Sequence, residues 1–190
     1  MSRTEIKLAG FGGQGIVLAG FILGKAISIY DKKNAVLTQS YGPEARGGAC
    51  SADVVTADGE IDFPEVTIPQ ISVIMSQEAY TKFGHNITKN GMLLIDENLV
   101  KLDDKLEEFK IFSIPSTRFA EDLGRKIVAN IVMIGFFTAV AKIVSLESMK
   151  KSLLGSVPKG TEELNMSALM KGYEYGQSQI KSGSSTKKSK

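Results

Sequence analysis

Cysteine is nearly absent from this chain of 190 residues, which contains only Cys50. One thiol cannot build a disulfide framework, and it cannot supply the four thiolates of an ordinary iron–sulfur cluster or a cysteine-rich zinc site. An apolar signal segment is also absent from the first residues. We therefore expect a cytoplasmic protein that depends on a hydrophobic core, with no metal held by this chain alone.

An excess of positive charge is absent from the body of the chain. The formal net charge is +2, but residues 181–190 have four lysines and no acid, so residues 1–180 have 19 basic and 21 acidic side chains. Nucleic-acid binding usually needs a basic face rather than a basic tail. We expect no nucleic-acid partner, and we expect residues 181–190, which are poor in apolar side chains, to form a disordered basic tail.

A hydrophobic run long enough to span a membrane is also missing. The longest uncharged segment, residues 127–141, has 15 residues, whereas a span needs about 20. Asn130, Gly135 and Thr138 interrupt it further. We expect a helix buried inside the protein and no membrane association.

The pattern of apolar residues predicts one Rossmann-like, three-layer α/β domain over residues 1–180, with a parallel-to-mixed sheet flanked by helices. A strand, a glycine loop, a helix and a second strand come first, which is typical of a βαβ unit with a parallel pair. A hairpin around Asp58-Gly59 then makes the sheet mixed. The predicted strands are residues 5–9, 35–38, 49–56, 61–63, 71–75, 92–95 and 110–114.

Helices are expected between and after these strands, at residues 16–30, 146–154 and 162–180. On the first of them, Gly20 and Gly24 would allow close approach to the sheet. Ser116 or Thr117 is expected to cap another helix, whose first turn would contain Glu121 and Asp122. Gly124 would separate that helix from the buried apolar one.

The first motif, Gly-Phe-Gly-Gly-Gln-Gly at residues 10–15, matches G-x-G-x-x-G between a strand and a helix. Glycines allow a tight turn and close approach of the backbone to a phosphate, and the following helix offers unpaired N–H groups. A tight turn packed against protein is equally compatible with the loop. The acid that a dinucleotide site needs at the end of the second strand is missing, because Thr38-Gln39-Ser40 stands there. The candidate ligand-binding residues are Gly10, Gly12, Gly13, Gln14 and Gly15.

The second motif is the polar loop at residues 39–48, which follows the second predicted strand. In a doubly wound sheet it would lie at the carboxyl edge beside the glycine loop. Arg46 offers a bidentate contact to phosphate or carboxylate. Docking of another subunit, or an ordered surface loop with a local Glu44–Arg46 pair, remains open. The candidate residues are Ser40, Tyr41, Gly42, Glu44, Arg46 and Gly47.

Other polar residues are expected to be structural. His85 is predicted to cap a helix C-terminus, and Cys50 to be an inert strand residue. The acidic pairs at 96–97, 103–104 and 107–108 are predicted to be solvated. Asn130 needs hydrogen-bond partners if its helix is buried, so it could hold a loop or an interface in place.

The two loops, together with the helix that begins at Ala129-Asn130, resemble the gamma subunit of 2-oxoacid:ferredoxin oxidoreductases, the pyruvate/ketoisovalerate oxidoreductase gamma type. The form Tyr-Gly-Pro-Glu-Ala-Arg-Gly-Gly at residues 41–48 is most similar to the 2-oxoglutarate synthase branch. The likeness covers residues 4–180, which is nearly the whole chain.

This resemblance implies a multi-subunit enzyme that decarboxylates a 2-oxoacid, forms the acyl-CoA and reduces ferredoxin. Thiamine diphosphate, Mg and the iron–sulfur clusters would belong to partner subunits, namely alpha and beta, with a delta or ferredoxin-like subunit as a further candidate. This chain would hold no catalytic residue and would help to bind coenzyme A. A free-standing nucleotide-binding reductase module and a purely structural docking subunit are the alternatives.

Overall fold

The computed structural model describes residues 3–40, 48–103 and 109–182. Within these residues, six strands form one sheet in the order β2-β3-β1-β4-β5-β6. Strands β1, β4, β5 and β6 are parallel, and β3 runs antiparallel between β1 and β2, so the predicted mixed sheet is confirmed. The strands are β1 (Arg3–Phe11), β2 (Asn34–Ser40), β3 (Ala49–Ala57), β4 (Ile71–Ile74), β5 (Met92–Asp96) and β6 (Lys110–Ile114).

The predicted parallel pair of first and second strands is wrong, because β3 lies between them. Strand β2 does run in the same direction as β1, but it forms the edge of the sheet. Most of β3 is buried, whereas both ends of β2 are exposed. The small and β-branched side chains of β3 suit a strand covered on both faces, which favours its inner position.

The predicted hairpin is also wrong, because residues 61–63 form no strand. Both edges of β3 are already paired, with β1 and β2, so no edge is left for a returning strand. The chain instead continues irregularly, and the Arg3 guanidinium donates to the carbonyl oxygens of Phe63 (2.6 Å) and Glu65 (3.1 Å). Pro64 in this segment has no N–H to donate to a ladder.

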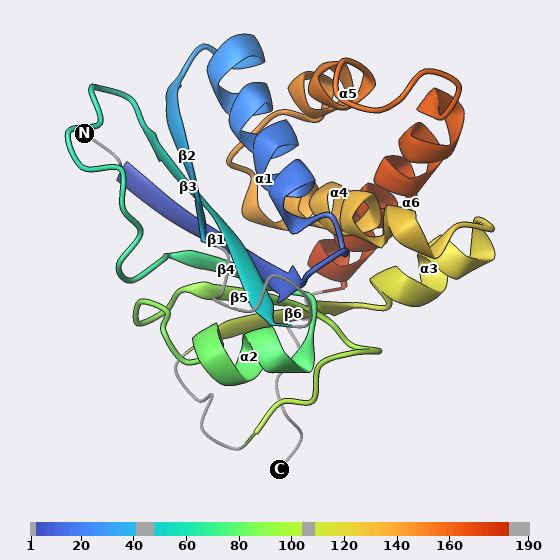
Figure 1. The fold of residues 1–190 in the computed structure, drawn as a ribbon, viewed down its shortest axis with the longest axis horizontal. Coiled ribbons are helices and arrows are strands. Elements are labelled where there is room, and N and C mark those ends of the chain that lie inside the picture. The colour runs from blue at the N-terminus through green and yellow to red at the C-terminus, as the bar shows by residue number, and fades with distance from the viewer. Residues whose placement is uncertain (1–2, 41–47, 104–108, 183–190) are drawn as a thin grey trace.

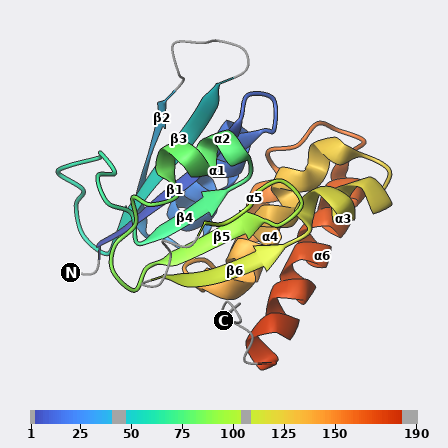
Figure 2. The ribbon, with the colours of Figure 1, turned by 90° about the horizontal axis from the view of Figure 1, so that it is seen from below.

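The helices cover the two faces of the sheet unequally (Figures 1 and 2). One face packs on α1, α4, α5 and α6, while the opposite face packs on the short α2. The helices are α1 (Ile16–Lys25) with its π-helical extension η1 (Ala26–Tyr30), α2 (Gln77–Phe83), α3 (Ser116–Asp122), η2 (Lys126–Val128), α4 (Ala129–Ala141), α5 (Leu146–Leu154) and α6 (Glu162–Lys181). Helix α6 includes Lys181, the first residue of the predicted tail, and residues 183–190 lie outside the described residues.

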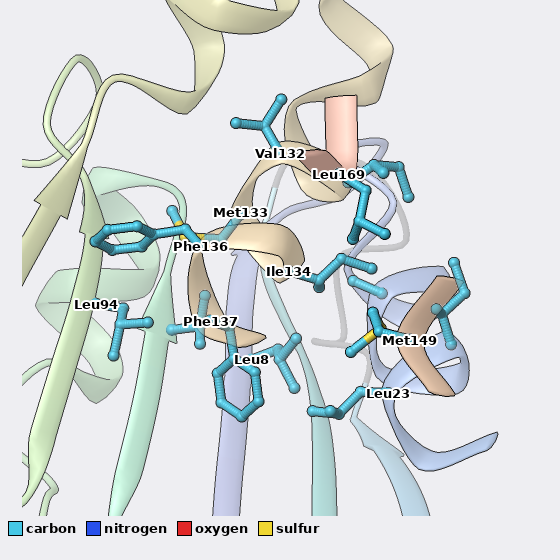
Figure 3. Close-up of a cluster of buried hydrophobic side chains, with 14 of the residues drawn as sticks. Leu8, Leu23, Leu94, Val132, Met133, Ile134, Phe136, Phe137, Met149 and Leu169 are labelled. Atoms are coloured by element: carbon cyan, nitrogen blue, oxygen red, sulfur yellow. The ribbon is translucent and has the colours of Figure 1, made fainter. Parts of the chain in front are cut away.

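Helix α4 is the centre of the core, because every one of its residues is buried. Figure 3 shows its side chains among Leu8 and Leu94 of the sheet and Leu23, Met149 and Leu169 of the neighbouring helices α1, α5 and α6. Glycines at the crossing of α4 and α6 let the two backbones touch, since a Cβ on Gly135 or Gly172 would collide with the other helix. The predicted buried helix is confirmed, and among the described residues we find no helix long and apolar enough to cross a membrane.

Helix α1 approaches β3 closely at one of the two glycines that suggested it. A Cβ on Gly20 would lie 2.7 Å from the Cβ of Ala52, whereas a Cβ on Gly24 would meet nothing within 4 Å. The prediction is therefore right for Gly20 and wrong for Gly24, which faces open space. The close approach holds the start of α1 against the sheet.

Candidate functional site

The glycine loop lies at the carboxyl end of β1 and leads directly into α1. Gly13 and Gly15 have φ values of 99° and 72°, in the left-handed region that favours glycine. The N–H of Gln14 donates to the carbonyl of Phe11 (3.1 Å), and the N–H of Ala19 donates to that of Gly15 (3.0 Å). No side chain caps α1 at Gly15. The N–H groups that precede Ala19 in the first turn therefore have no helical acceptor.

Gln14 uses its side chain to hold the loop together. Its Oε1 accepts from the N–H of Phe11 (2.6 Å), and its Nε2 donates to the carbonyl of Met75 (2.8 Å) just after β4. A Cβ on Gly10 would lie 2.5 Å from Gln14 Oε1, so that glycine leaves room for the amide. These two candidate ligand-binding residues therefore have structural partners inside the protein.

Gly12 and Gly13 form the open part of the loop. Both are exposed, and a Cβ built on either would meet no protein atom within 4 Å. Gly12 also has no positive φ. Added atoms at Gly12 would thus affect what approaches the loop rather than the fold.

Asn130 at the start of α4 fixes the other end of the loop. Only 2% of this residue is exposed. Its Nδ2 donates to the Gly15 carbonyl (3.0 Å), and its Oδ1 accepts from the N–H of Ile131 (2.9 Å). The prediction that this buried amide holds a loop is confirmed.

The second motif begins at the same edge of the sheet as the glycine loop. In the register of the strands, Ser40 pairs with Ser51, and Ser51 pairs with Ala9. With one strand between them, Ser40 and Ala9 are about 10 Å apart. The other candidate residues of this motif, Tyr41, Gly42, Glu44, Arg46 and Gly47, lie outside the described residues.

Asp96 is buried, so its predicted solvation is wrong. Its Oδ2 accepts from the hydroxyls of Ser116 and Thr117 (both 2.6 Å) and from the N–H of Thr117 (2.9 Å), while its Oδ1 accepts from the N–H of Asn98 (3.0 Å). The carboxylate of β5 therefore supplies the cap of α3 that was expected from Ser116 or Thr117 themselves. Asp96 is the last residue of β5, and that position alone does not distinguish a buried acid from an exposed one in the sequence.

Two details around α3 complete this correction. Glu121 and Asp122 lie in the last turn of α3, not in its first, because the helix starts at Ser116 and ends at Asp122. Gly124, with φ of 84°, separates α3 from η2 and α4 as predicted.

Phe11 is a feature of the glycine loop that sequence reasoning missed. It occupies the second position of the motif, and 40% of it is exposed. Phe11 is the last residue of β1, so its ring lies exposed where the glycine loop begins. Its presence between two glycines was the available indication.

His85 and Cys50 have structural surroundings. The C-cap of α2 is Gly84 rather than His85, whose Nε2 lies 3.0 Å from Asp103 Oδ2. Cys50 is buried in β3, and burial raises the pKa of its thiol, in agreement with an inert strand residue. Among the described residues, no three His, Cys, Asp or Glu side chains come together as a metal site would require.

The fold and this site define a mixed α/β domain with a glycine loop at the carboxyl end of its first strand. The chain belongs to the pyruvate ferredoxin/flavodoxin oxidoreductase family, whose model matches residues 5–175. The two loops and the Asn130 helix predicted a gamma subunit of this enzyme class, and that prediction is confirmed.

Similar proteins agree with this family over nearly the whole chain. The 2-oxoglutarate synthase subunit KorC of Methanocaldococcus jannaschii is 56% identical over 174 residues, which are 90% of this chain and 93% of that protein. The gamma subunit of a keto/oxoacid ferredoxin oxidoreductase from Geobacter sulfurreducens has a crystal structure and is 39% identical to this chain. The two structures match with a TM-score of 0.85 over 94% of this chain and 98% of that one.

A more distant structure shares the fold alone. The 2-oxoglutarate:ferredoxin oxidoreductase of Magnetococcus marinus, with 2-oxoglutarate, coenzyme A and succinyl-CoA bound, is 19% identical at a TM-score of 0.81. The match covers 94% of this chain but 32% of that one. The same fold therefore occurs as nearly the whole of the Geobacter chain and as about a third of the longer Magnetococcus chain.

Proposed function

We propose that this chain is the gamma subunit of a 2-oxoglutarate:ferredoxin oxidoreductase and that its glycine loop contacts the phosphates of coenzyme A. The chain itself would hold no catalytic residue. Alpha and beta subunits, with a delta or ferredoxin-like subunit as a further candidate, would hold thiamine diphosphate, Mg and the iron–sulfur clusters. The substrate assignment rests on the 56% identity with KorC.

The observation that supports a role for the loop is the open, uncapped start of α1. Coenzyme A has a diphosphate and a ribose phosphate, and each needs hydrogen-bond donors. The first turn of α1 offers N–H groups and the positive end of the helix dipole. Gly12 and Gly13 leave open space outside the backbone, since a Cβ on either would meet no protein atom within 4 Å.

A valine at Gly12 tests this role directly. Gly12→Val would obstruct the loop surface while meeting no protein atom within 4 Å at its Cβ. We expect the KM for coenzyme A of the assembled enzyme to rise about tenfold, the value of one lost contact to a charged group, with unchanged thiamine diphosphate content.

Gly24→Val is the matched control for this experiment, because a Cβ at Gly24 also meets open space but lies on α1 away from the loop. It should leave the KM for coenzyme A unchanged. If Gly12→Val also left that KM unchanged in a correctly assembled enzyme, the phosphate contact would be refuted.

Arg46→Lys separates ligand contact from subunit docking in the second motif. Lysine keeps the charge but loses the planar fork, so a bidentate contact to phosphate would weaken by about 10-fold to 150-fold in apparent affinity for coenzyme A. If Arg46 pairs with another subunit, the variant should assemble poorly and any assembled enzyme should show normal kinetics. Size-exclusion chromatography measures assembly, and kinetics on the same preparation measure the apparent affinity for coenzyme A. Normal assembly with normal kinetics would reject both ligand contact and subunit docking for Arg46.

A docking role has its own observation in its favour. Leu18, Phe21 and Ile29 are exposed along one side of α1 and η1, and Phe11 is exposed at the loop before them. Purification from the native host with identification of the co-purifying chains tests assembly. Partner chains with thiamine diphosphate and iron–sulfur clusters are expected, whereas an isolated chain with bound flavin or nicotinamide cofactor would favour the free-standing reductase module.

A further inference from the structure

We infer that Asn130 is a positioning residue that aims the first-turn N–H groups of α1 at a phosphate, through its hydrogen bond to Gly15; the inference rests on the proposed contact with coenzyme A. The two residues are 115 positions apart, and the bond between Asn130 Nδ2 and the Gly15 oxygen is 3.0 Å long. The loop thus receives its shape partly from α4, a helix outside the glycine motif.

Asn130 acts on the loop through the Gly15 carbonyl. Its oxygen accepts two hydrogen bonds, from the Ala19 N–H and from Asn130 Nδ2, each 3.0 Å long. A carbonyl has two lone pairs, so both are used. Because the trans peptide is planar, a fixed Gly15 carbonyl also fixes the Ile16 N–H, which points the opposite way, out of the helix start.

The amide of Asn130 is itself held in one orientation. Its Oδ1 accepts from the N–H of Ile131 (2.9 Å), which leaves Nδ2 toward Gly15. Helix α4 cannot shift easily, because its backbone meets that of α6 at Gly135 and Gly172. Asn130 Nδ2, which donates to the Gly15 carbonyl, is therefore part of the rigid core. The proposed phosphate-binding turn is thus formed before a ligand arrives.

Gly15 and Asn130 also require each other sterically. A Cβ on Gly15 would collide with Asn130 Nδ2, and the φ of 72° at this position already favours glycine. The last glycine of the motif, Gly15, is thus required by the contact with Asn130 as well as by the turn.

The test replaces Asn130 in the assembled enzyme. Asn130→Leu keeps the branching of the side chain but has no donor, so the Gly15 carbonyl keeps only its helical partner. We expect the KM for coenzyme A to rise about fivefold or more, and kcat and the KM for 2-oxoglutarate to stay within about twofold. Hydrogen exchange of the Ala19 N–H, which donates to the same carbonyl, should become faster by a similar factor. Asn130→Ala, which cannot overpack the site, should give the same pattern.

Thr138→Val is the matched control on the same helix. Its hydroxyl is buried and donates to the Ile134 carbonyl (2.7 Å) within α4. It lies about 12 Å along the helix axis from Asn130. This variant removes a buried hydrogen bond without touching the loop, so the KM for coenzyme A and the exchange of the Ala19 N–H should not change.

The outcomes separate this inference from the proposed function. Normal exchange of the Ala19 N–H and a normal KM for coenzyme A in both Asn130 variants would overturn the inference, as would failure of both variants to assemble. Faster exchange with an unchanged KM for coenzyme A, in Asn130→Leu and in Gly12→Val alike, would support the hold of Asn130 on the loop and refute the contact with coenzyme A.

Discussion

Two helices that follow parallel strands, α1 and α3, begin at the carboxyl edge of the same sheet. They differ in whether a side chain accepts a hydrogen bond from the N–H groups of the first turn. At α3 the buried carboxylate of Asp96 accepts from the Thr117 N–H and from two hydroxyls. At α1 the N-cap is Gly15, and no side chain accepts from the first turn. Both helix starts favour a negative charge, and among the residues that the structure describes one is supplied only at α3.

The surroundings of the two helix starts differ in the same sense. Asp96, Ser116 and Thr117 are buried, so the start of α3 is part of the core. Gly12 and Gly13 are exposed, so the start of α1 opens to the outside. The comparison teaches that an anion at α3 stabilises the fold, whereas the described residues leave the start of α1 accessible to an anion from outside.

Alanine at Gly15 should cause the largest loss of stability. The left-handed conformation costs a residue with a Cβ about 1–2 kcal/mol, and the displaced Asn130 would lose a hydrogen bond worth about 1 kcal/mol. We expect the free energy of unfolding to fall by about 2–4 kcal/mol, measured by urea denaturation. Gly12→Ala, where there is open space, should change it by less than about 0.5 kcal/mol. Equal effects at the two glycines would show that the loop is not held by Asn130.

Alanine at Asp96 should destabilise the fold without affecting the ligand. The Thr117 N–H and two hydroxyls would lose their buried acceptor, which should lower the free energy of unfolding by about 2–3 kcal/mol. The KM for coenzyme A should stay unchanged in enzyme that still assembles. A rise in that KM as large as the one expected for Gly12→Val would mean that the start of α3 belongs to the binding site too.

A smaller effect is expected at α2, whose start follows β4 at this same edge. Ser76 caps it, and its Oγ accepts from the Ala79 N–H (3.2 Å). Ser76→Ala should lower the free energy of unfolding by about 1 kcal/mol. Ser167→Ala, at an exposed position inside α6, provides the control, because alanine there favours the helix. If the two variants had equal stability, the cap would contribute nothing.

Local patterns in the sequence predicted much of this arrangement. The apolar runs at β4, β5 and β6 were identified as strands, because a run of that length between turn residues indicates a buried strand. Asn130 was singled out because an amide in an apolar helix needs partners. Both inferences depend on neighbouring residues alone, which is why they succeeded.

Pairings between distant segments could not be predicted in this way. The insertion of β3 between β1 and β2 depends on which strand edges are free, and the apolar pattern of one strand does not specify its neighbours. Asp96 and an exposed acid look alike in sequence, because the difference lies in α3 folding back onto β5. The internal use of Gln14 likewise depends on Met75, 61 residues further on.

The smallest effect should come from Asp31, which lies at the start of α5. Its carboxylate accepts from the Ser145 N–H (2.9 Å) and from the hydroxyls of Ser145 (2.9 Å) and Ser148 (2.6 Å). Burial raises the pKa of Asp31, but the hydrogen bonds from Ser148 and Ser145 outweigh it and hold the pKa below its ordinary value. A lowered pKa in the folded state means that the stabilisation is present above the unfolded pKa and is lost as the pH falls through the folded value.

Asp31→Asn tests this pH dependence. At pH 7 the variant should unfold with a free energy lower by less than about 1 kcal/mol, since the carboxylate is partly exposed. That difference should shrink below about pH 4, where the carboxyl of the unfolded chain and then that of the folded chain take up a proton. Urea denaturation between pH 7 and pH 3 measures it, with the exposed Asp62→Asn as a control for general acid effects. A difference that stayed constant over this range would show that the charge of Asp31 does not stabilise the start of α5.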